Sequence, residues 1–550
     1  MECRQGRALR RILASALLVY GAAACSGGSG GASGASLVPG PDPPASDALA
    51  SRFLAQATFG ATRDEISKLR VIGYTAWFDE QFAAPVSLER PALSQLQHNG
   101  HKVGQERRQE RWWKIAVQGP DQLRQRVAFA LSEIFVISDV AGDLEGDPLG
   151  VAEYYDTLAR DAFGNFRVLL EDVTLSPQMG KYLSMLRNPK PDPASNIRPD
   201  ENYAREVMQL FTIGLKKLNS DGTPQLDINN LPVPTFDQSV VEGFAHVFTG
   251  WNYAGADSWE WGDENYLPME PWESYHDTGA KILLDGHFVA PGQTAREDLD
   301  EALDVLFNHQ NVAPFIARRL IQRLVTSNPS PAYIGRVAAT FDDDGAGQRG
   351  NLWAVVKAIL TDVDARTGNV TDPTTFGKLR EPLLRQTALW RAFDAHASDA
   401  RFREHYPESD YGQAALRAPS VFNFFAPDYR PPASSAAAGL FAPEFQITTD
   451  TLITTTTNKE NDLVFYQYAG NPHVKQGDVL IRVAYERSLA DDPAALVDHL
   501  DVLLMGGTMS AAMRSVVIDL VDGTDASDPT QRVLEAIYII ITSPEFAVQK

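Results

Sequence analysis

The sequence predicts a mainly α-helical fold: a large multi-helix globular domain with a small β-hairpin excursion. Apolar residues recur at helical spacing in one segment after another, and N-cap residues or turn signals separate these segments. No alternation of strands and helices supports a parallel sheet. The 550 residues are 44% hydrophobic and 22% charged, which is ordinary for a globular protein able to bury a large core.

The N-terminus has the pattern of a signal peptide, residues 1–24. Several arginines precede an apolar run from Ile12 to Ala24, which is too short to remain as a membrane span. Cys25 follows three alanines, which fits ordinary signal-peptidase cleavage after a small residue and also resembles a bacterial lipobox, although Ala22 stands where lipoboxes usually carry Leu. We interpret Cys25 as a lipidation site, with ordinary cleavage as the alternative.

Residues 25–45 are rich in Gly, Ser and Pro, and they are predicted to form a flexible tether. The only other cysteine is Cys3, within the signal peptide, so the processed protein can form no internal disulfide. An extracytoplasmic protein is therefore expected. Ser26 after the cysteine favours a lipoprotein of the outer membrane or cell envelope, and a periplasmic or secreted protein is the alternative.

The charge balance narrows the range of partners. The chain has a formal net charge of -22 at pH 7, with 71 acidic and 49 basic residues. Such acidity argues against nucleic acid as a partner and against adhesion to anionic lipid through a basic face. Contact with a membrane is therefore expected only through the lipid anchor.

The folded part begins near Ser46, a plausible N-cap, and helices follow one another through the first third of the chain. Thr62 to Glu65 form a capping box that opens a helix, and Gly73 is predicted to end that helix. Further helices are predicted over residues 106–117, 121–137, 151–170 and 175–186.

The best-formed amphipathic helix is predicted within residues 200–218. Asp200 is a suitable N-cap after Pro199, and Gly214 is a natural stop. The apolar stripe comprises Tyr203, Val207, Leu210 and Phe211. The opposite face carries Asn202, Arg205, Glu206 and Gln209. This polar face is either solvated or part of a buried hydrogen-bonded network.

Residues 223–235 are predicted to form the hairpin and to hold most of the strand in the protein. A second capping box, Thr235 to Gln238, opens the next helix. A loop rich in Trp and Asp follows over residues 257–275, and loops of this length are often functional. The rest of the chain is predicted to be helical apart from an irregular stretch over residues 417–439.

The possible metal-binding patterns are weak, and no metal site is predicted. Residues 217–228 fail the ligand pattern of an EF-hand loop at two positions. Glu242 and His246 stand at i, i+4, which is more typical of a structural hydrogen bond than of a metal site. Nucleotide-binding and hydrolase signatures such as GxGxxG, the Walker motif, GxSxG and HExxH are absent from the sequence, so no cofactor is identified.

Several segments together resemble a large bacterial family, domain of unknown function 1800 (DUF1800). These are ENYAREVMQLFTIG, HVFTGW, HDTGAK, the PFIARRLIQRLVTSNPSP run, KLREP, LRAPSVFNFFAPDY and SPEFAVQK. The resemblance runs from about Arg52 to Lys550 and implies a single helical domain, residues 46–550. Ser132-Glu133 departs from many relatives, which have a Trp-His-type segment, so a metal site built on that histidine does not carry over.

The resemblance implies an exported bacterial protein, and the family brings no established activity or catalytic residues. Its members are often encoded beside a second exported family that is similar to sulfatases. The first functional hypothesis is a surface-tethered binding or assembly protein that holds a glycan or such an exported sulfatase-like partner. Aromatic side chains are efficient anchors at binding sites. Its candidate binding residues are Asn202, Trp251, Trp259, Trp261 and Trp272.

The alternative hypothesis is an extracytoplasmic hydrolase acting on a polymer or envelope component. Two carboxylates can divide acid and base roles, and an Asp beside a His can fix its tautomer. The candidate catalytic residues are Glu201, Arg205, Glu206, His276, Asp277 and Lys281. Asn202, Arg205 and Glu206 are further expected to be shielded from water and to lie near the loop of residues 276–281.

Overall fold

The computed structural model describes residues 42–432 and 438–550. The predicted signal peptide, Cys25 and most of the predicted tether therefore lie outside the described residues. From Asp42 on, the described residues belong to one compact unit, Pro39–Lys550. None of its described helices is both long enough and apolar enough to span a membrane.

The predicted fold class is confirmed, because helices dominate and strands form only two-residue pairs. The first helices begin where the sequence predicts: α2 is capped by Ser46 and α3 by Thr62. Gly73 kinks α3, with φ of 80°, but the helix continues beyond it. The N-terminal helices are α2 (Asp47–Ala57), α3 (Arg63–Ala83), α4 (Arg90–His98), α5 (Gln105–Gln118), α6 (Gln122–Ser132), α7 (Gly142–Glu145), α8 (Pro148–Asp161), α9 (Phe166–Thr174) and α10 (Pro177–Tyr182).

The central amphipathic helix is shorter than predicted. An α-helical turn, α11 (Asn202–Glu206), continues as a π-helix, η1 (Val207–Thr212). Gly214 ends it with φ of 71°, as expected for a left-handed stop. The apolar stripe is buried except for Leu210, which is half-buried.

The hairpin prediction is only partly right. The chain does reverse there, since Asp227 N donates to Leu231 O at 2.8 Å and isolated bridges join Leu218 to Pro224 and Leu226 to Pro232. Proline lacks the N–H group that a continuous ladder needs, so no named strand forms in this excursion. The strands lie elsewhere: β1 (Trp251–Asn252), β2 (Glu270–Pro271), β3 (Lys281–Ile282), β4 (Phe288–Val289), β5 (Lys378–Leu379) and β6 (Val548–Gln549). The antiparallel pairs are β1 with β2, β3 with β4, and β5 with β6.

The helix after the hairpin, α12 (Gln238–Val247), is capped by Asp237 and not by Thr235. The Thr235 hydroxyl instead contacts the carbonyl oxygen of Gly214 and ties the base of the hairpin. The remaining helical elements are η2 (Glu273–Tyr275), η3 (Leu284–Gly286), α13 (Ala295–Asn308), α14 (Val312–Leu324), α15 (Pro331–Asp342), α16 (Leu352–Thr361), α17 (Val363–Thr371), α18 (Pro382–Ala392), α19 (Pro407–Tyr411), η4 (Pro443–Ile447), α21 (Asp450–Phe465), α22 (Ala484–Arg487), α23 (Pro493–Leu500), η5 (Asp501–Met505), α24 (Ala511–Gly523), α25 (Pro529–Ile541) and α26 (Pro544–Ala547).

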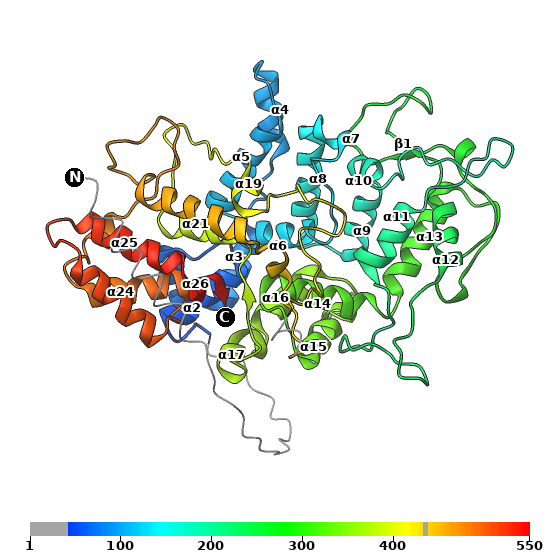
Figure 1. The fold of residues 1–550 in the computed structure, drawn as a ribbon. Helices are drawn as coiled ribbons and strands as arrows, with labels where there is room; N and C mark the ends of the chain where they lie inside the picture. Colours follow the sequence, from blue (N-terminus) through cyan, green and yellow to red (C-terminus); the bar gives the residue numbers. More distant parts are fainter. Residues whose placement is uncertain (1–41, 433–437) are drawn as a thin grey trace. The chain divides into compact units, whose positions relative to one another are not determined.

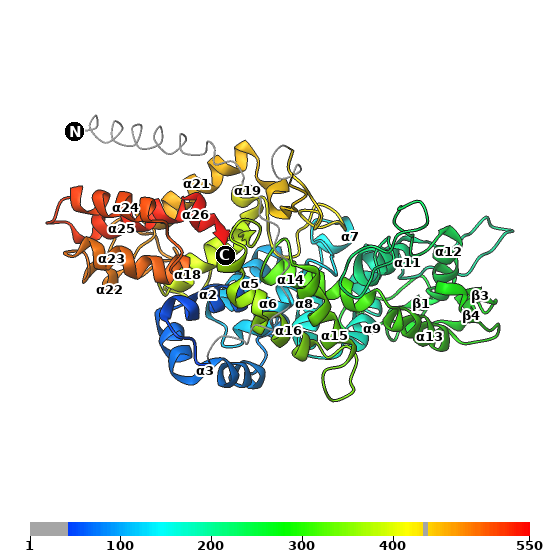
Figure 2. The same ribbon diagram turned by 90° about the horizontal axis from the view of Figure 1, so that it is seen from below.

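One large hydrophobic core runs through these elements. In both Figure 1 and Figure 2, α22 to α25 lie at one end of the described unit and α11 to α13 at the other, with α6, α14 and α16 between them. The C-terminal strand β6 returns to pair with β5, which ties the end of the chain to its middle. Most of the candidate site residues belong to the end formed by α11 to α13.

Candidate functional site

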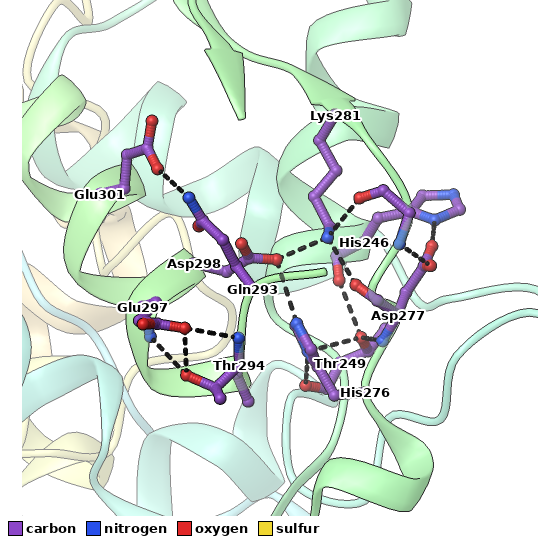
Figure 3. Close-up of polar contacts among 12 residues, drawn as sticks. His246, Thr249, His276, Asp277, Lys281, Gln293, Thr294, Glu297, Asp298 and Glu301 are labelled. Atoms are coloured by element: carbon purple, nitrogen blue, oxygen red, sulfur yellow. Dashed lines mark hydrogen bonds and ion pairs between the residues drawn. The ribbon is translucent and has the colours of Figure 1, made fainter. Parts of the chain in front are cut away.

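Three charged side chains meet beneath the loop that follows η2. His276 Nε2 lies 3.0 Å from Asp298 Oδ2, and Lys281 Nζ lies 2.5 Å from the same oxygen. Figure 3 shows the ammonium group and the imidazole ring directed at this one carboxylate, which is carried by α13. Each of the three side chains is at most 2% exposed. We call His276, Lys281 and Asp298 the His276 cluster.

Lys281 has all its donors occupied. Besides Asp298, its ammonium group contacts the carbonyl oxygens of Asp277 and Gly279, the latter at 2.9 Å. An ammonium group has three donors and no acceptor. Lys281 therefore has no donor left for a substrate, and its contacts fix the turn of residues 277–279.

His276 faces hydrogen-bond acceptors on both sides. Its Nδ1 lies 3.0 Å from the carbonyl oxygen of Thr249, and its Nε2 faces Asp298. The Thr249 hydroxyl donates to the carbonyl oxygen of His246 at 2.7 Å, so it does not serve as a donor to the ring. Each ring nitrogen thus has a hydrogen-bond acceptor beside it within the described chain. The cluster is a buried carboxylate shared by the Lys281 ammonium group and the His276 ring, an arrangement that orders a loop.

Asp277 points the other way and pairs with His246 of α12. Its Oδ2 contacts His246 Nδ1, its Oδ1 accepts from Gly279 N at 2.8 Å, and its N–H donates to the Thr249 hydroxyl at 2.9 Å. The hydrogen bond with His246 holds the pKa of Asp277 at about 2. His246 is 32% exposed, and its ring extends away from the His276 cluster in Figure 3. With its proton on Nδ1, Nε2 is a basic nitrogen within reach of solvent.

Glu201 and Arg205 form a separate network on the surface. Arg205 Nη2 lies 2.9 Å from Glu201 Oε2 and 3.0 Å from Gln238 Oε1, and Gln238 also approaches Glu242 at 3.4 Å. Gln238 and Glu242 are followed by His246 at a spacing of four residues, so they stand on one side of α12. Through Gln238, Glu201 and Arg205 thus contact the side of α12 that also carries His246, the partner of Asp277.

The expected burial of Asn202, Arg205 and Glu206 is wrong for two of the three. Asn202 is exposed and the Arg205 side chain is 39% exposed, because they face outward beside α12. Glu206 is buried, and burial raises its pKa. Within the described chain its side chain forms no hydrogen bond or ion pair with the loop of residues 276–281. The catalytic roles assigned to these residues remain predictions.

The tryptophans do not form a common binding face. Trp251 and Trp259 are buried, and Trp259 stacks on Tyr275 with ring centroids 3.9 Å apart. Trp272 is half-buried beside the same pair, whereas Trp261 is 78% exposed. Trp251, Trp259 and Trp272 therefore pack the base of their loop, and among the four only Trp261 is well placed for a ligand.

A second charged cluster was missed by sequence reasoning. Lys378 Nζ lies 3.2 Å from Glu381 and 3.1 Å from Glu444, and Arg323 lies 3.6 Å from Glu133. Burial raises the pKa of Glu133, whereas Lys378 and Arg323 overcome burial and lower the pKa of Glu381. The available signal was Glu133, a charged residue within the largely apolar run of residues 127–137.

The predicted catalytic residues differ in their access to solvent. An open depression of about 770 Å³ lies beside the His276 cluster, lined by Leu284, Asp285, Gly286, His287, Glu301, Asp304, Val305, Asn308 and His309. None of the three residues of the His276 cluster lines it. Across residues 42–432 and 438–550, no three His, Cys, Asp or Glu side chains are grouped to hold a metal ion. Of the predicted catalytic residues, those in the His276 cluster are sealed from substrate.

A family model described as "Protein of unknown function (DUF1800)" matches residues 52–548. The match covers nearly the whole chain, so the chain belongs to this family. Searches of the curated proteins and of the solved structures found no match. The family description assigns no reaction or ligand.

Proposed function

We propose that this member of the DUF1800 family is an exported binding or assembly protein that docks onto a partner protein through its hairpin. The observation that carries the proposal is an ordered apolar tip. Leu226, Ile228 and Leu231 are all more than half exposed, and Ile228 is 98% exposed. We call these three residues the hairpin tip.

The hairpin tip is held by hydrogen bonds at its turn. Asp227 Oδ1 accepts from the N–H groups of Asn229 and Leu231, both at 2.8 Å. A preorganised segment loses little conformational entropy on binding. Fully burying an aliphatic side chain of this size contributes about 1.5–3 kcal/mol. The tip therefore fits an apolar pocket on a partner.

The prolines of the hairpin indicate how the partner would be engaged. Pro224, Pro232 and Pro234 lack backbone N–H groups, which weakens this excursion as an edge for strand addition. We therefore expect the partner to be bound by insertion of the side chains of the hairpin tip, and not by addition of a strand. The net charge of -22 disfavours a second copy of the chain as the partner, because two such acidic molecules repel each other.

The exported sulfatase-like protein implied by the family resemblance is the partner to test first. We expect Ile228→Asp to weaken its association with this chain at least tenfold in biolayer interferometry, since a charge would enter an apolar pocket. Val71→Asp is the matched control, because Val71 is also highly exposed, at 80%, but lies on α3. Equal binding by the Ile228 variant and wild type would contradict docking through the tip, and no binding by wild type would contradict this partner.

The proposed location is the cell envelope, with the protein anchored through a lipid on Cys25. The supporting pattern is the signal peptide followed by Cys25 and a Gly/Ser/Pro-rich tether. Replacing Cys25 by Ala is expected to move the protein from the membrane fraction to the soluble fraction. Unchanged fractionation of that variant would refute the anchor.

A hydrolase is the second candidate, and the exposed nitrogen of His246 favours it. Asp277 fixes the ring so that Nε2 can act as a general base. We expect any hydrolysis of chromogenic acyl, glycosyl, sulfate or phosphate esters to be lost in His246→Gln and retained in His287→Gln. His287 is an exposed histidine that also pairs with a carboxylate, Glu301, at 2.6 Å. Activity that survives His246→Gln would exclude this base.

A further inference from the structure

The helix α14 carries basic residues that the proposed docking function does not use. Arg323, near its C-terminus, is compensated because it lies 3.6 Å from Glu133 and 4.6 Å from the ring of Phe425. Arg318 and Arg319, one turn earlier, also lie over aromatic rings but lack such a carboxylate partner. Neither forms an ion pair within 4.0 Å with any residue of the described chain.

Arg318 is half-buried, and its guanidinium forms no hydrogen bond with the part of the chain that the structure describes. It lies over the ring of Phe441, 5.0 Å from the centroid, and Arg430 lies over the same ring at 4.5 Å. Phe441 is fixed by paired hydrogen bonds with Asn328, at 2.8 and 2.9 Å. Two guanidinium groups therefore lie over one aromatic ring whose backbone is fixed, and neither has an acceptor for its N–H groups among the described residues.

Arg319 adds a third positive charge next to Arg318. Its guanidinium donates to Gln322 Oε1 at 3.3 Å and lies 4.9 Å from the ring centroid of Phe315. Burial and the neighbouring Arg318 lower its pKa to about 9, while Asp428 acts in the opposite direction without reaching ion-pair distance in the described chain. Positive charge is thus concentrated on a chain that carries 71 acidic residues against 49 basic ones.

We infer that Arg318, Arg319 and Arg430 form a binding site for an oxyanion group: a sulfate, a phosphate or a carboxylate. We call these residues the arginine cluster. The planar guanidinium fork matches such groups and can donate two parallel hydrogen bonds. A bound anion would supply the missing acceptors and offset the repulsion between the arginines. The site is independent of the hairpin tip, which lies in a different part of the sequence.

The test is binding of inorganic sulfate and phosphate to the full chain, measured by isothermal titration calorimetry at constant ionic strength. We expect saturable binding to wild type and an affinity at least tenfold lower in Arg318→Gln and in Arg430→Gln. Arg430 is exposed, so its replacement leaves folding intact even if the Arg318 variant folds poorly. Arg514→Gln is the control, because Arg514 is exposed and already paired with Asp498 at 2.6 Å. Measurable sulfate binding of equal affinity in all four proteins would overturn the site.

Thermal unfolding supplies a second readout. Sulfate stabilises most proteins by exclusion from their surface, so only the difference between wild type and variants counts. Without a multivalent anion, we expect the unfolding temperature of Arg319→Gln to equal or exceed that of wild type, because repulsion between Arg319 and Arg318 is relieved. A lower unfolding temperature in that variant would contradict the inference.

The same calorimetric experiment distinguishes a free small anion from an anionic group carried by a polymer. Acetate and a carboxylated polysaccharide are compared with sulfate and a sulfated polysaccharide. Binding of the free ions assigns the site to small anions, whereas binding of a polymer alone, lost in Arg430→Gln, assigns it to an anionic group on that polymer. Failure of all four probes would refute the site.

Discussion

The His276 cluster and the arginine cluster both combine charged residues of one helix, α13 or α14, with residues outside helices, but they differ in how far their hydrogen-bond donors are paired. In the His276 cluster, Lys281 has an acceptor for every donor and both nitrogens of His276 are engaged. In the arginine cluster, Arg318 forms no hydrogen bond with the described residues. Asp298 Oδ1 has no partner among the described residues, but it is an acceptor and not a donor. A network whose donors are all paired stabilises a loop, whereas one with spare donors has capacity for an anion.

Replacing Asp298 should produce the largest effect, because it would leave the buried Lys281 ammonium group and the His276 ring without their shared acceptor. We expect Asp298→Ala to lower the free energy of unfolding by about 3–5 kcal/mol, as is typical when a buried ion pair loses one partner. Urea denaturation measures this loss. In contrast, an arginine-cluster variant such as Arg319→Gln should leave the free energy of unfolding unchanged or raise it.

Asp300→Ala is the matched control, since Asp300 is on the same helix but half-exposed, where it pairs with Arg296 at 2.8 Å. The control should change stability by less than about 1 kcal/mol. Similar losses of unfolding free energy in Asp298→Ala and Asp300→Ala would contradict this prediction. They would show that burial does not make the ion pairs of the His276 cluster more stabilising than a surface pair.

A smaller effect is expected at acid pH from the pair of Asp277 and His246, which borders the His276 cluster. The pKa of Asp277 is lowered from 3.8 to about 2, so its stabilisation is fully present above pH 3.8 and is lost as the pH falls toward 2. Since this carboxyl is partly solvated, we expect it to contribute only about 1 kcal/mol. The pH dependence of urea unfolding between pH 2 and 5 should be shallower in Asp277→Asn than in wild type.

Asp399→Asn provides the comparison for that experiment. Asp399 also has its pKa lowered to about 2, by a hydrogen bond with Arg403, but it lies at the surface. Its replacement should alter the acid limb less than replacement of Asp277. An equal change would mean that the connection of Asp277 to the loop of residues 276–281 adds nothing to stability.

The sequence predicted the helical framework well because its signals are local. Ser46 and Thr62 cap helices where expected, and Gly214 ends the central helix. Thr235 failed as a cap because its hydroxyl contacts Gly214, a residue 21 positions away. Such tertiary hydrogen bonds leave no trace in local spacing.

The candidate site was predicted less completely, because His276 and Lys281 were identified but their partner Asp298 was not. Asp298 lies in an acidic helix segment that looks solvent-exposed. A signal was nevertheless present, since Asp298 falls in phase with Ala295, Ala302 and Leu306 on the buried stripe of α13. An acidic residue on an apolar stripe indicates a buried partner.

The smallest expected effect concerns Glu206, which is buried like Asp298 but unpaired like Arg318. One of its carboxylate oxygens has no partner among the described residues, and burial raises its pKa above 4.5. A raised carboxyl pKa means that the folded state loses stability as the pH rises through that value. Glu206→Gln, which cannot ionise, should match wild type near pH 4 and be more stable by about 0.5 kcal/mol at pH 8, a figure reduced for partial solvation.

Combining Glu206→Gln with Asp298→Ala tests whether Glu206 belongs to the His276 cluster at all. The two residues share no hydrogen-bond partner in the described structure, and effects of independent sites add within about 0.3–0.5 kcal/mol. We therefore expect the double variant to show the sum of the two single changes in urea denaturation. A coupling energy above about 1 kcal/mol would place Glu206 in the same network as Asp298. Glu206 would then belong to the same cluster as His276, Lys281 and Asp298, and would no longer be a separate buried charge on the central helix.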